Sequence, residues 1–412
     1  MKKFSTLATI IALIILIGGC AAPPKKVEET VFFPPPPDLP RIQYLTSFSG
    51  LNDIEEQTAF NRFVVGEKQR KKLDKPYGVG IYDGKIYVCD TNDTVIVFDL
   101  KAKKYGPLKG ARGPGKLMQP INISISEDGI KFVTDPIRGQ VVVFDRNDEF
   151  LKSYGVPGKW KPVDAVPFED RLYVVDNLNA VVKVFELKSG EIAKTIGDKG
   201  DPSERLDRPT NIAFDRNGDM YITDVGRFQI IRYDRDGHFK SSIGKSGDFI
   251  GHFARPKGLA VDKQGYLYVV DAAFNNVQLF NDKGRVLLFF SEGGPEPGNL
   301  LLPAKVAVGY DNLQYFQQYM KPNFEVEYLI LVTSQFGDRS VNVFGYGKEK
   351  GKQYSSDEEL LKVMEGKRQA EFKKLKESGK TDTDDQAKKP QKEDSPGQEG
   401  GTTKPAAPAK TE

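Results

Sequence analysis

A unit of 42 to 47 residues recurs along this chain and limits the folds available to it. Each unit opens with a proline and a short apolar run, and the six prolines are Pro76, Pro120, Pro162, Pro209, Pro256 and Pro303. A run ending in Asp follows, as at residues 220–224, and then a run ending in an aromatic residue, as at 229–233. Repeats of this length are single supersecondary units that bury their apolar faces only against neighbouring copies.

Each unit predicts four short antiparallel strands. Runs of β-branched and aromatic residues are separated by turn residues such as Asn217-Gly218, which is the pattern of strands joined by hairpins. The fourth runs lie at residues 150–155, 191–197, 238–244 and 285–292. Four strands in a repeat of this length make a propeller blade. We therefore predict an all-β propeller of four-stranded antiparallel blades over residues 40–347.

The sixth unit lacks a fourth strand of its own. Its second and third strands are predicted at residues 328–333 and 341–344, after an insertion at 311–327. An unassigned strand at residues 42–50 resembles the fourth strand of the other units. If this N-terminal strand completes the last blade, both open edges disappear and the ring closes. The prediction is a six-bladed β-propeller closed by its N-terminal strand.

The repeats resemble those of the NHL family of β-propellers across residues 40–347. The features that carry the resemblance are the Gly-rich stretch at 247–256, the Tyr-Val-x-Asp strand and the Val-x-Val-Phe strand. The chain departs from the family where Arg is expected five places after the Asp, because Gln140, Gln229 and Asn276 stand there. Ser334 also replaces the sixth Asp. These departures bear on any ligand implied by the resemblance and little on the fold.

The N-terminus is typical of a secreted lipoprotein. Residues 1–19 combine a positive end, a short apolar run and small residues, as a signal peptide does. Small residues directly before Cys20 resemble a bacterial lipobox, in which this cysteine is lipidated; the alternative is an ordinary signal peptide with a chance cysteine. Residues 20–39 are predicted to form the lipid anchor and a proline-rich tether. Ala21 favours sorting to the outer membrane, so we expect a protein that is lipid-anchored in the bacterial cell envelope.

The C-terminal part of the chain changes in composition. The stretch from Ser356 to Glu359 is a capping box, and it predicts a charged helix within residues 348–378. Residues 379–412 contain no large apolar side chain and are predicted to be a disordered tail.

Composition excludes several functions. The net charge of +3 argues against a nucleic-acid partner. Two cysteines and two histidines argue against haem attachment and zinc sites.

The two histidines are predicted to lie on opposite faces of the propeller. His238 is predicted in a turn between strands three and four and His252 in a loop between blades, so they do not share a metal. Cys89 is predicted to be a buried apolar residue. We expect no cofactor, and calcium remains open although no ligand-spaced cluster stands out.

Three groups of residues are candidates for a functional role. The repeated aspartates are predicted to accept backbone hydrogen bonds, with a cation ring as the alternative, and they are Asp90, Asp135, Asp176, Asp224 and Asp271. A basic rim on one face is a candidate for partner contact, with a simply solvated rim as the alternative, and it comprises Arg138, Arg208, Arg227, Arg255 and Arg339 together with Lys75 and Lys161. The insertion offers Tyr315, Phe316 and Tyr319 for partner contact, or for packing on its own blade.

These observations favour a non-enzymatic binding or scaffolding protein that contacts a protein or glycan of the cell envelope. The alternative from another class is a calcium-dependent hydrolase or lactonase acting at the propeller channel, and a third is a sensor or assembly factor for envelope polymers. Lipoprotein propellers that resemble this one occur beside extracytoplasmic electron-transfer proteins, so the resemblance implies a multihaem cytochrome as a candidate partner. Fold alone does not decide among these functions.

Overall fold

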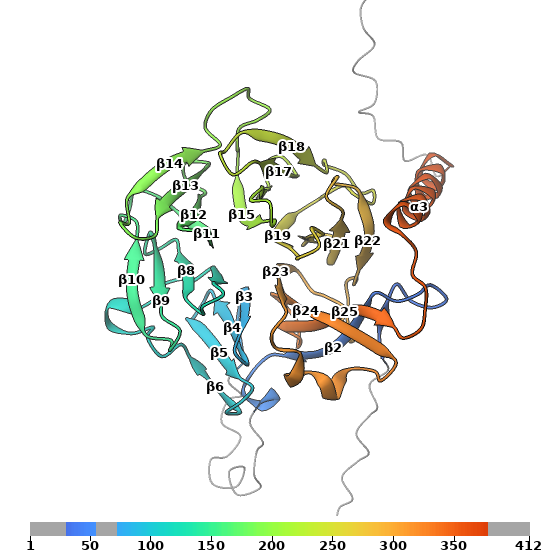
Figure 1. The fold of residues 1–412 in the computed structure, drawn as a ribbon, viewed down its shortest axis with the longest axis horizontal. Helices are drawn as coiled ribbons and strands as arrows, with labels where there is room; N and C mark the ends of the chain where they lie inside the picture. The colour runs from blue at the N-terminus through green and yellow to red at the C-terminus, as the bar shows by residue number, and fades with distance from the viewer. Residues whose placement is uncertain (1–29, 55–71, 378–412) are drawn as a thin grey trace, which may run out of the picture. The chain divides into compact units, whose positions relative to one another are not determined.

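The computed structural model describes residues 30–54 and 72–377. These residues form six antiparallel sheets arranged as the blades of a propeller (Figure 1). The predicted signal peptide, Cys20 and the predicted disordered tail lie outside the described residues.

Five blades follow the repeat, each with four consecutive strands. Blade 1 contains β3 (Pro76–Tyr82), β4 (Lys85–Asp90), β5 (Val95–Asp99) and β6 (Lys104–Pro107). Blade 2 contains β7 (Asn122–Ile125), β8 (Lys131–Asp135), β9 (Gln140–Phe144) and β10 (Phe150–Tyr154). Blade 3 contains β11 (Pro162–Phe168), β12 (Arg171–Asp176), β13 (Val181–Glu186) and β14 (Ile192–Ile196). Blade 4 contains β15 (Pro209–Phe214), β16 (Met220–Asp224), β17 (Gln229–Tyr233) and β18 (Phe239–Ile243). Blade 5 contains β19 (Pro256–Val261), β20 (Leu267–Asp271), β21 (Asn276–Phe280) and β22 (Val286–Phe290).

Blade 6 is built from both ends of the propeller sequence. Its strands run in the order β1 (Phe32–Phe33), β2 (Ile42–Phe48), β25 (Val341–Glu349), β24 (Phe324–Ser334) and β23 (Pro303–Gly309). In the register of β2 on β25, Tyr44 lies opposite Phe344 and Phe48 opposite Val341. The N-terminal strand therefore closes the ring as the sequence predicts.

The predicted tether is shorter than residues 20–39. The prediction was wrong for its C-terminal part, because β1 pairs with β2 and adds a fifth strand to blade 6. The Phe33 ring packs against Phe290 and Phe344, with centroids 6.0 and 6.2 Å away. Phe32 and Phe33 thus pair with the edge of an existing sheet. The sequence does not indicate this pairing, because the prolines that follow these residues are typical of an unpaired spacer.

The core of the propeller is divided among the blade interfaces. Within the described residues, six clusters of buried apolar side chains each join two adjacent blades. One example joins Tyr173 and Val175 of blade 3 to Ile212 and Ile222 of blade 4. Because every blade needs a neighbour on both faces, the sixth interface is as necessary as the other five.

The insertion in blade 6 binds that blade to blade 1. It forms two short 3₁₀ turns, η3 (Leu313–Tyr315) and η4 (Gln317–Tyr319), and its last residues belong to β24. Asn312 Oδ1 accepts the Gly84 N–H at 2.7 Å, and Gln43 Nε2 donates to the Tyr319 carbonyl at 2.8 Å. Phe316 is fully buried beside Phe48. Of the two roles predicted for Phe316, the structure shows packing on its own blade and not partner contact, because its ring belongs to the core.

Three shorter elements complete the description. The 3₁₀ turns η1 (Leu51–Asp53) and η2 (Gly113–Gly115) lie in loops between blades, and the helix α3 spans Asp357–Glu377. The Glu359 N–H donates to Ser356 Oγ at 3.4 Å and the Ser356 N–H to Glu359 Oε2 at 3.0 Å, so the predicted capping box begins this helix. Leu361 and Met364 are buried. None of the helices in the described part of the chain has the length and apolar character needed to cross a membrane.

Candidate functional site

The repeated aspartates hold the loops on one face of the propeller through hydrogen bonds to backbone N–H groups. Asp224 ends β16, and its carboxylate accepts the N–H groups of Asp207 at 2.7 Å, Arg208 at 3.0 Å and Gly226 at 3.0 Å. The bonds join the turn after the second strand to the loop that enters the blade. The other aspartates accept comparable backbone bonds, and they are Asp90, Asp135, Asp176 and Asp271. We call the surface made by these turns and interblade loops the loop face.

In blade 6, Ser334 takes the place of the aspartate that connects the turn to the entering loop. Ser334 Oγ accepts the Leu301 N–H at 3.3 Å and the Asn342 amide at 3.3 Å. A hydroxyl offers fewer acceptor positions than a carboxylate. The Ser holds one amide of the entering loop, whereas four of the five Asp residues hold two.

The five candidate arginines all lie on the loop face, but three of them brace its loops. Arg138 Nη1 donates to the Lys116 carbonyl at 2.6 Å, and Arg227 Nη1 donates to the Ser203 carbonyl at 2.5 Å. Arg339 donates to the Pro295 carbonyl. In each case the turn of a blade is bonded to the loop that leads into that blade. These guanidinium groups therefore hold loop conformations in addition to contributing positive charge.

The remaining candidates are divided between two faces. Arg208 and Arg255 are exposed on the loop face. Tyr315 and Tyr319 lie in the insertion that follows β23, at the opposite end of the strands, where Gly84 contacts it. Tyr319 is 38% exposed and Tyr315 is half-buried. The structure thus does not bring the aromatic candidates and the basic candidates into one site.

A ring of side chains surrounds the propeller axis on the innermost strands. It is formed by the second residue after each repeat proline, in blade order Gly78, Asn122, Asp164, Asn211, Gly258 and Lys305. Lys305 Nζ lies 2.6 Å from Asp164 Oδ2, and the two side chains are 8% and 1% exposed. Blades 6 and 3 are opposite each other in the ring (Figure 1). This ion pair therefore crosses the axis.

The two glycines of this ring allow the inner strands to approach closely. A Cβ atom on Gly78 would lie 2.6 Å from Asn122 Cα, and one on Gly258 would lie 2.5 Å from Lys305 Cα. Both distances are shorter than carbon atoms tolerate. The glycines thus bring the neighbouring strands close enough for a single Lys side chain to span the axis.

Amide groups surround the Asp164 carboxylate. Asn211 Nδ2 donates to Asp164 Oδ2 at 3.1 Å, as does the Ile212 N–H at 3.2 Å. Asn122 Nδ2 donates to the Val163 carbonyl at 2.7 Å. The Oδ1 atoms of Asn122 and Asn211 are buried without a hydrogen-bond partner among the described residues. Such atoms usually bond to ordered water in a polar interior.

A second buried cation lies beside this ring. Lys257 Nζ donates to Gln335 Oε1 at 2.9 Å and lies 5.4 Å from the centre of the Tyr77 ring. Burial, together with the positive charges of Arg255 and Lys75, lowers the pKa of Lys257 from 10.5 to about 8. The ammonium is stabilised by a neutral amide and an aromatic face, which compensate only part of its lost hydration.

The described residues contain no group of three or more His, Cys, Asp or Glu side chains that could hold a metal ion. His238 follows the turn after β17 and bonds to Asp234, with 3.0 Å between Nδ1 and Oδ2. His252 lies in the loop between blades 4 and 5 and is buried. Cys89 is fully buried, and burial raises the pKa of its thiol.

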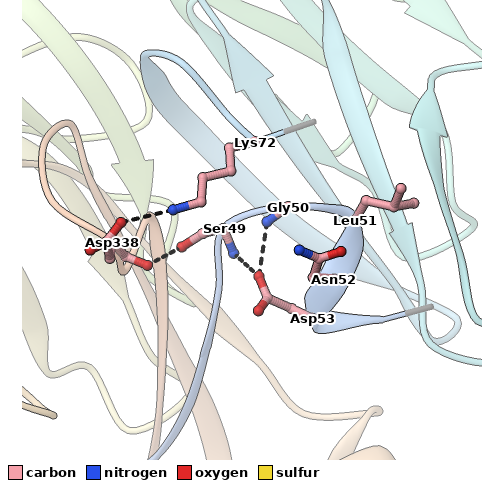
Figure 2. A pocket seen from close by; sticks show the side chains of 7 residues that line it. All are labelled: Ser49, Gly50, Leu51, Asn52, Asp53, Lys72 and Asp338. Carbon is pink, nitrogen blue, oxygen red and sulfur yellow. Dashed lines mark hydrogen bonds and ion pairs between the residues drawn. The ribbon is translucent and has the colours of Figure 1, made fainter. Parts of the chain in front are cut away.

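A small pocket lies between the end of the closing strand β2 and the residues that precede blade 1. Figure 2 shows its lining, which consists of Ser49, Gly50, Leu51, Asn52, Asp53, Lys72 and Asp338. The N–H groups of Ser49 and Gly50 both donate to Asp53 Oδ2, at 2.6 and 2.9 Å. Lys72 pairs with Asp338 at 2.8 Å. The polar groups of this pocket therefore bond to one another, and they join the closing strand to the last turn of blade 6.

Sequence reasoning missed the axial pair and Lys257. Both lie within two residues of a repeat proline, where the other blades carry small or neutral residues. Aligning the six units at their prolines and asking which of these positions carries a charge would have singled out Asp164, Lys257 and Lys305.

Comparison with known proteins supports the fold. A family model described as a 6-bladed β-propeller matches residues 158–244. A structural genomics protein of unknown function from Bacteroides thetaiotaomicron aligns with a TM-score of 0.52 and 13% identity, over 73% of this chain and 75% of that chain. An auxiliary nutrient binding protein from the same organism aligns with a TM-score of 0.51 and 12% identity, over 67% of this chain and 70% of that chain.

A streptogramin B lyase aligns with a TM-score of 0.46 and 13% identity, over 69% of this chain and 85% of that chain. The search of curated proteins found no match. The likeness to the two Bacteroides thetaiotaomicron structures, at 12–13% identity, establishes the fold alone. The chain is a six-bladed β-propeller.

The axial ion pair predicts a strong coupling in a double-mutant cycle. Lys305→Met leaves the Asp164 carboxylate buried without its cation, and Asp164→Asn leaves the Lys305 ammonium buried without its anion. Each single change should lower the free energy of unfolding by about 3 kcal/mol. The double variant should lose less than the sum, with a coupling of at least about 2 kcal/mol in urea unfolding. Additive effects would contradict a direct pair across the axis.

Lys257 predicts a specific dependence of stability on pH. Its pKa is about 8 in the folded protein against 10.5 in the unfolded chain, so the unfolded chain binds more protons between these values. The contribution of Lys257 to stability should therefore rise by about 2 kcal/mol as the pH increases from about 8 to about 10, and it is measured as a growing difference between the wild type and Lys257→Met. Lys257→Met should remove this rise, whereas Lys263→Met, which changes an exposed lysine near Tyr310, should retain it. Parallel curves for the wild type and Lys257→Met would contradict the assignment.

Proposed function

We propose that this chain is a non-enzymatic binding or scaffolding protein that uses the loop face for contact with a protein or glycan. The observation that carries the proposal is the ion pair between Lys305 and Asp164, with 2.6 Å between Nζ and Oδ2. A catalytic channel needs polar groups that are free to meet a substrate or a metal on the axis. Here the two charged groups of the axial ring bond to each other. Recognition then falls to the loops, which the repeated aspartates and the arginines hold in place.

The alternative is a calcium-dependent hydrolase or lactonase acting at the channel. It is favoured by the oxygen atoms near the axis, since the Asp164 carboxylate lies with the partnerless Oδ1 atoms of Asn122 and Asn211. Oxygen ligands of this kind suit calcium. The Lys305 ammonium opposes it, because a second cation beside this carboxylate would be repelled.

Calcium addition distinguishes the two functions. The binding proposal predicts that adding about 1 mM calcium to a chelator-treated sample changes the melting temperature of the full chain by less than about 1 °C. A metal that binds the native state at well below this concentration would stabilise it by about 2 kcal/mol or more. A rise of several degrees, together with hydrolysis of a lactone substrate that depends on calcium, would contradict the proposal.

We also propose that the protein is an NHL-type propeller displayed as a lipoprotein on the bacterial cell envelope, at the outer membrane. The motifs of residues 40–347 support the first part, and the positive end, apolar run and Cys20 support the second. By the same resemblance, a multihaem cytochrome is a candidate protein partner. Lipid anchoring would place the loop face within reach of other envelope proteins.

Lipidation at Cys20 has a direct test. Cells fed an alkyne analogue of palmitate should label the full chain, and the label should be lost in Cys20→Ser. Cys89→Ser, which changes the buried cysteine, should keep the label. Labelling that survives in Cys20→Ser would contradict a lipoprotein anchored at this residue.

A further inference from the structure

The loop face of blades 2 and 3 exposes four large aliphatic side chains. They are Met118, Ile137, Val156 and Leu178, with exposed fractions of 58%, 64%, 57% and 62%. Each comes from a different loop: the two interblade loops before blades 2 and 3, and the turns after β8 and β12. Large exposed apolar groups gathered on one surface mark interaction sites more often than isolated ones do.

Contacts among the loops show that these four residues form one surface. Met118 N–H donates to Asp135 Oδ2 at 2.5 Å, two residues before Ile137. A Cβ atom on Gly139 would lie 3.2 Å from Pro157 Cα, the residue after Val156. Asn179, which follows Leu178, donates through Nδ2 to the Lys159 carbonyl at 3.5 Å. We call this surface the blade 2–3 patch.

The basic side chains of the blade 2–3 patch have no exposed acidic neighbour in the same loops, because Asp135 and Asp176, which adjoin these loops, are fully buried. Lys116, Lys159 and Lys161 are exposed, and Arg138 is partly exposed. The loop segments 116–119, 136–140, 155–161 and 177–180 contain no Asp or Glu. By contrast, the loop at residues 198–208 on blade 4 mixes Asp198, Asp201, Glu204 and Asp207 with its basic residues. Of these two surfaces, the blade 2–3 patch is therefore the one whose positive charge is not offset by Asp or Glu in its own loop segments.

The blade 2–3 patch is also held in a fixed shape. The buried Trp160 donates through Nε1 to the Gly139 carbonyl at 2.5 Å and so joins its two blades. Arg138 spans from the Lys116 carbonyl to Gln140 Oε1, both at 2.6 Å. A preformed surface loses little entropy when it binds, which favours recognition of a partner segment.

The chemistry of the patch favours a protein over a membrane. Surfaces that insert into lipid usually expose aromatic residues, whereas the Trp of this region is only 4% exposed. Aliphatic side chains that share their loops with cations match a surface that presents carboxylates together with apolar groups. Resting on the proposed binding function, we propose that the blade 2–3 patch is the docking surface for an acidic protein segment that carries apolar side chains.

Site-specific photo-crosslinking of the full chain in the cells that produce it tests this. Benzoylphenylalanine replaces Ile137 or Leu178, and the matched controls are Leu151 and Ile192, which are 53% and 54% exposed on the outer strands of the same blades. Mass spectrometry identifies the crosslinked peptide. The proposal expects adducts from positions 137 and 178, none from 151 and 192, and a crosslinked segment rich in Asp, Glu and apolar residues.

Affinity for a synthetic peptide of the identified segment gives the second measurement. The double variant Ile137→Ser/Leu178→Ser should weaken binding at least about tenfold, because it removes two apolar contacts from the interface. Leu151→Ser/Ile192→Ser should change binding by less than about twofold and controls for folding. Lys159→Glu/Lys161→Glu should also weaken binding, most strongly at low salt. Unchanged affinity in Ile137→Ser/Leu178→Ser would overturn the proposal.

Crosslinkers at Arg208 and Arg255 probe the rest of the loop face. They show whether docking at the blade 2–3 patch fails alone or together with the proposed binding function. Protein adducts at 208 or 255 alone would overturn docking at the patch and leave the binding function standing. An absence of adducts to protein or glycan at all four loop-face positions would overturn both. Adducts of positions 137 and 178 to phospholipid would identify a membrane contact and overturn the docking of a protein segment.

Discussion

The pairing of β2 with β25 is the interaction on which the rest of this structure depends. Each blade buries an apolar cluster against both neighbours, so a ring of six blades needs six interfaces. The last interface exists because β1 and β2 from the N-terminal side complete a blade whose other three strands come from the C-terminal side. The insertion and the polar groups around Ser49 add hydrogen bonds at the same seam. Without this closure two sheet edges and two apolar faces would be exposed to water.

Closure also determines where the molecule can interact. Inner strands that are held in a ring bring Lys305 within 2.6 Å of Asp164 from the opposite blade, and this bond uses the charged groups on the axis. The carboxylates at the ends of the second strands fix the loops of one face. A surface composed of loops from different blades keeps its shape only while the blades keep their positions. The proposed binding function and the proposed docking at the blade 2–3 patch both depend on the rigidity of the ring.

Much of the fold could be predicted because its determinants are local. Proline, hairpin turns and alternating apolar runs repeat within each unit, and the strand at residues 42–50 has the pattern of a fourth strand. Long-range contacts were harder to predict: the pairing of Phe32 and Phe33 with β2 was missed because prolines follow them, and the burial of Phe316 was one of two alternatives that the sequence left open. The axial pair joins residues 141 positions apart. Such a contact depends on the ring geometry, which single-sequence patterns do not specify.

Hydrogen exchange of the full chain in native conditions tests the closed ring most directly. If β2 is an integral strand of blade 6, the amides of Ile42–Phe48 exchange only through global unfolding. Their opening free energy then equals that of the amides in the buried strands β4 and β16, and it falls in parallel when denaturant is added. Exchange of the β2 amides by a separate opening of lower free energy, with the other blades still protected, would show that the ring is held together without this strand and would contradict the account.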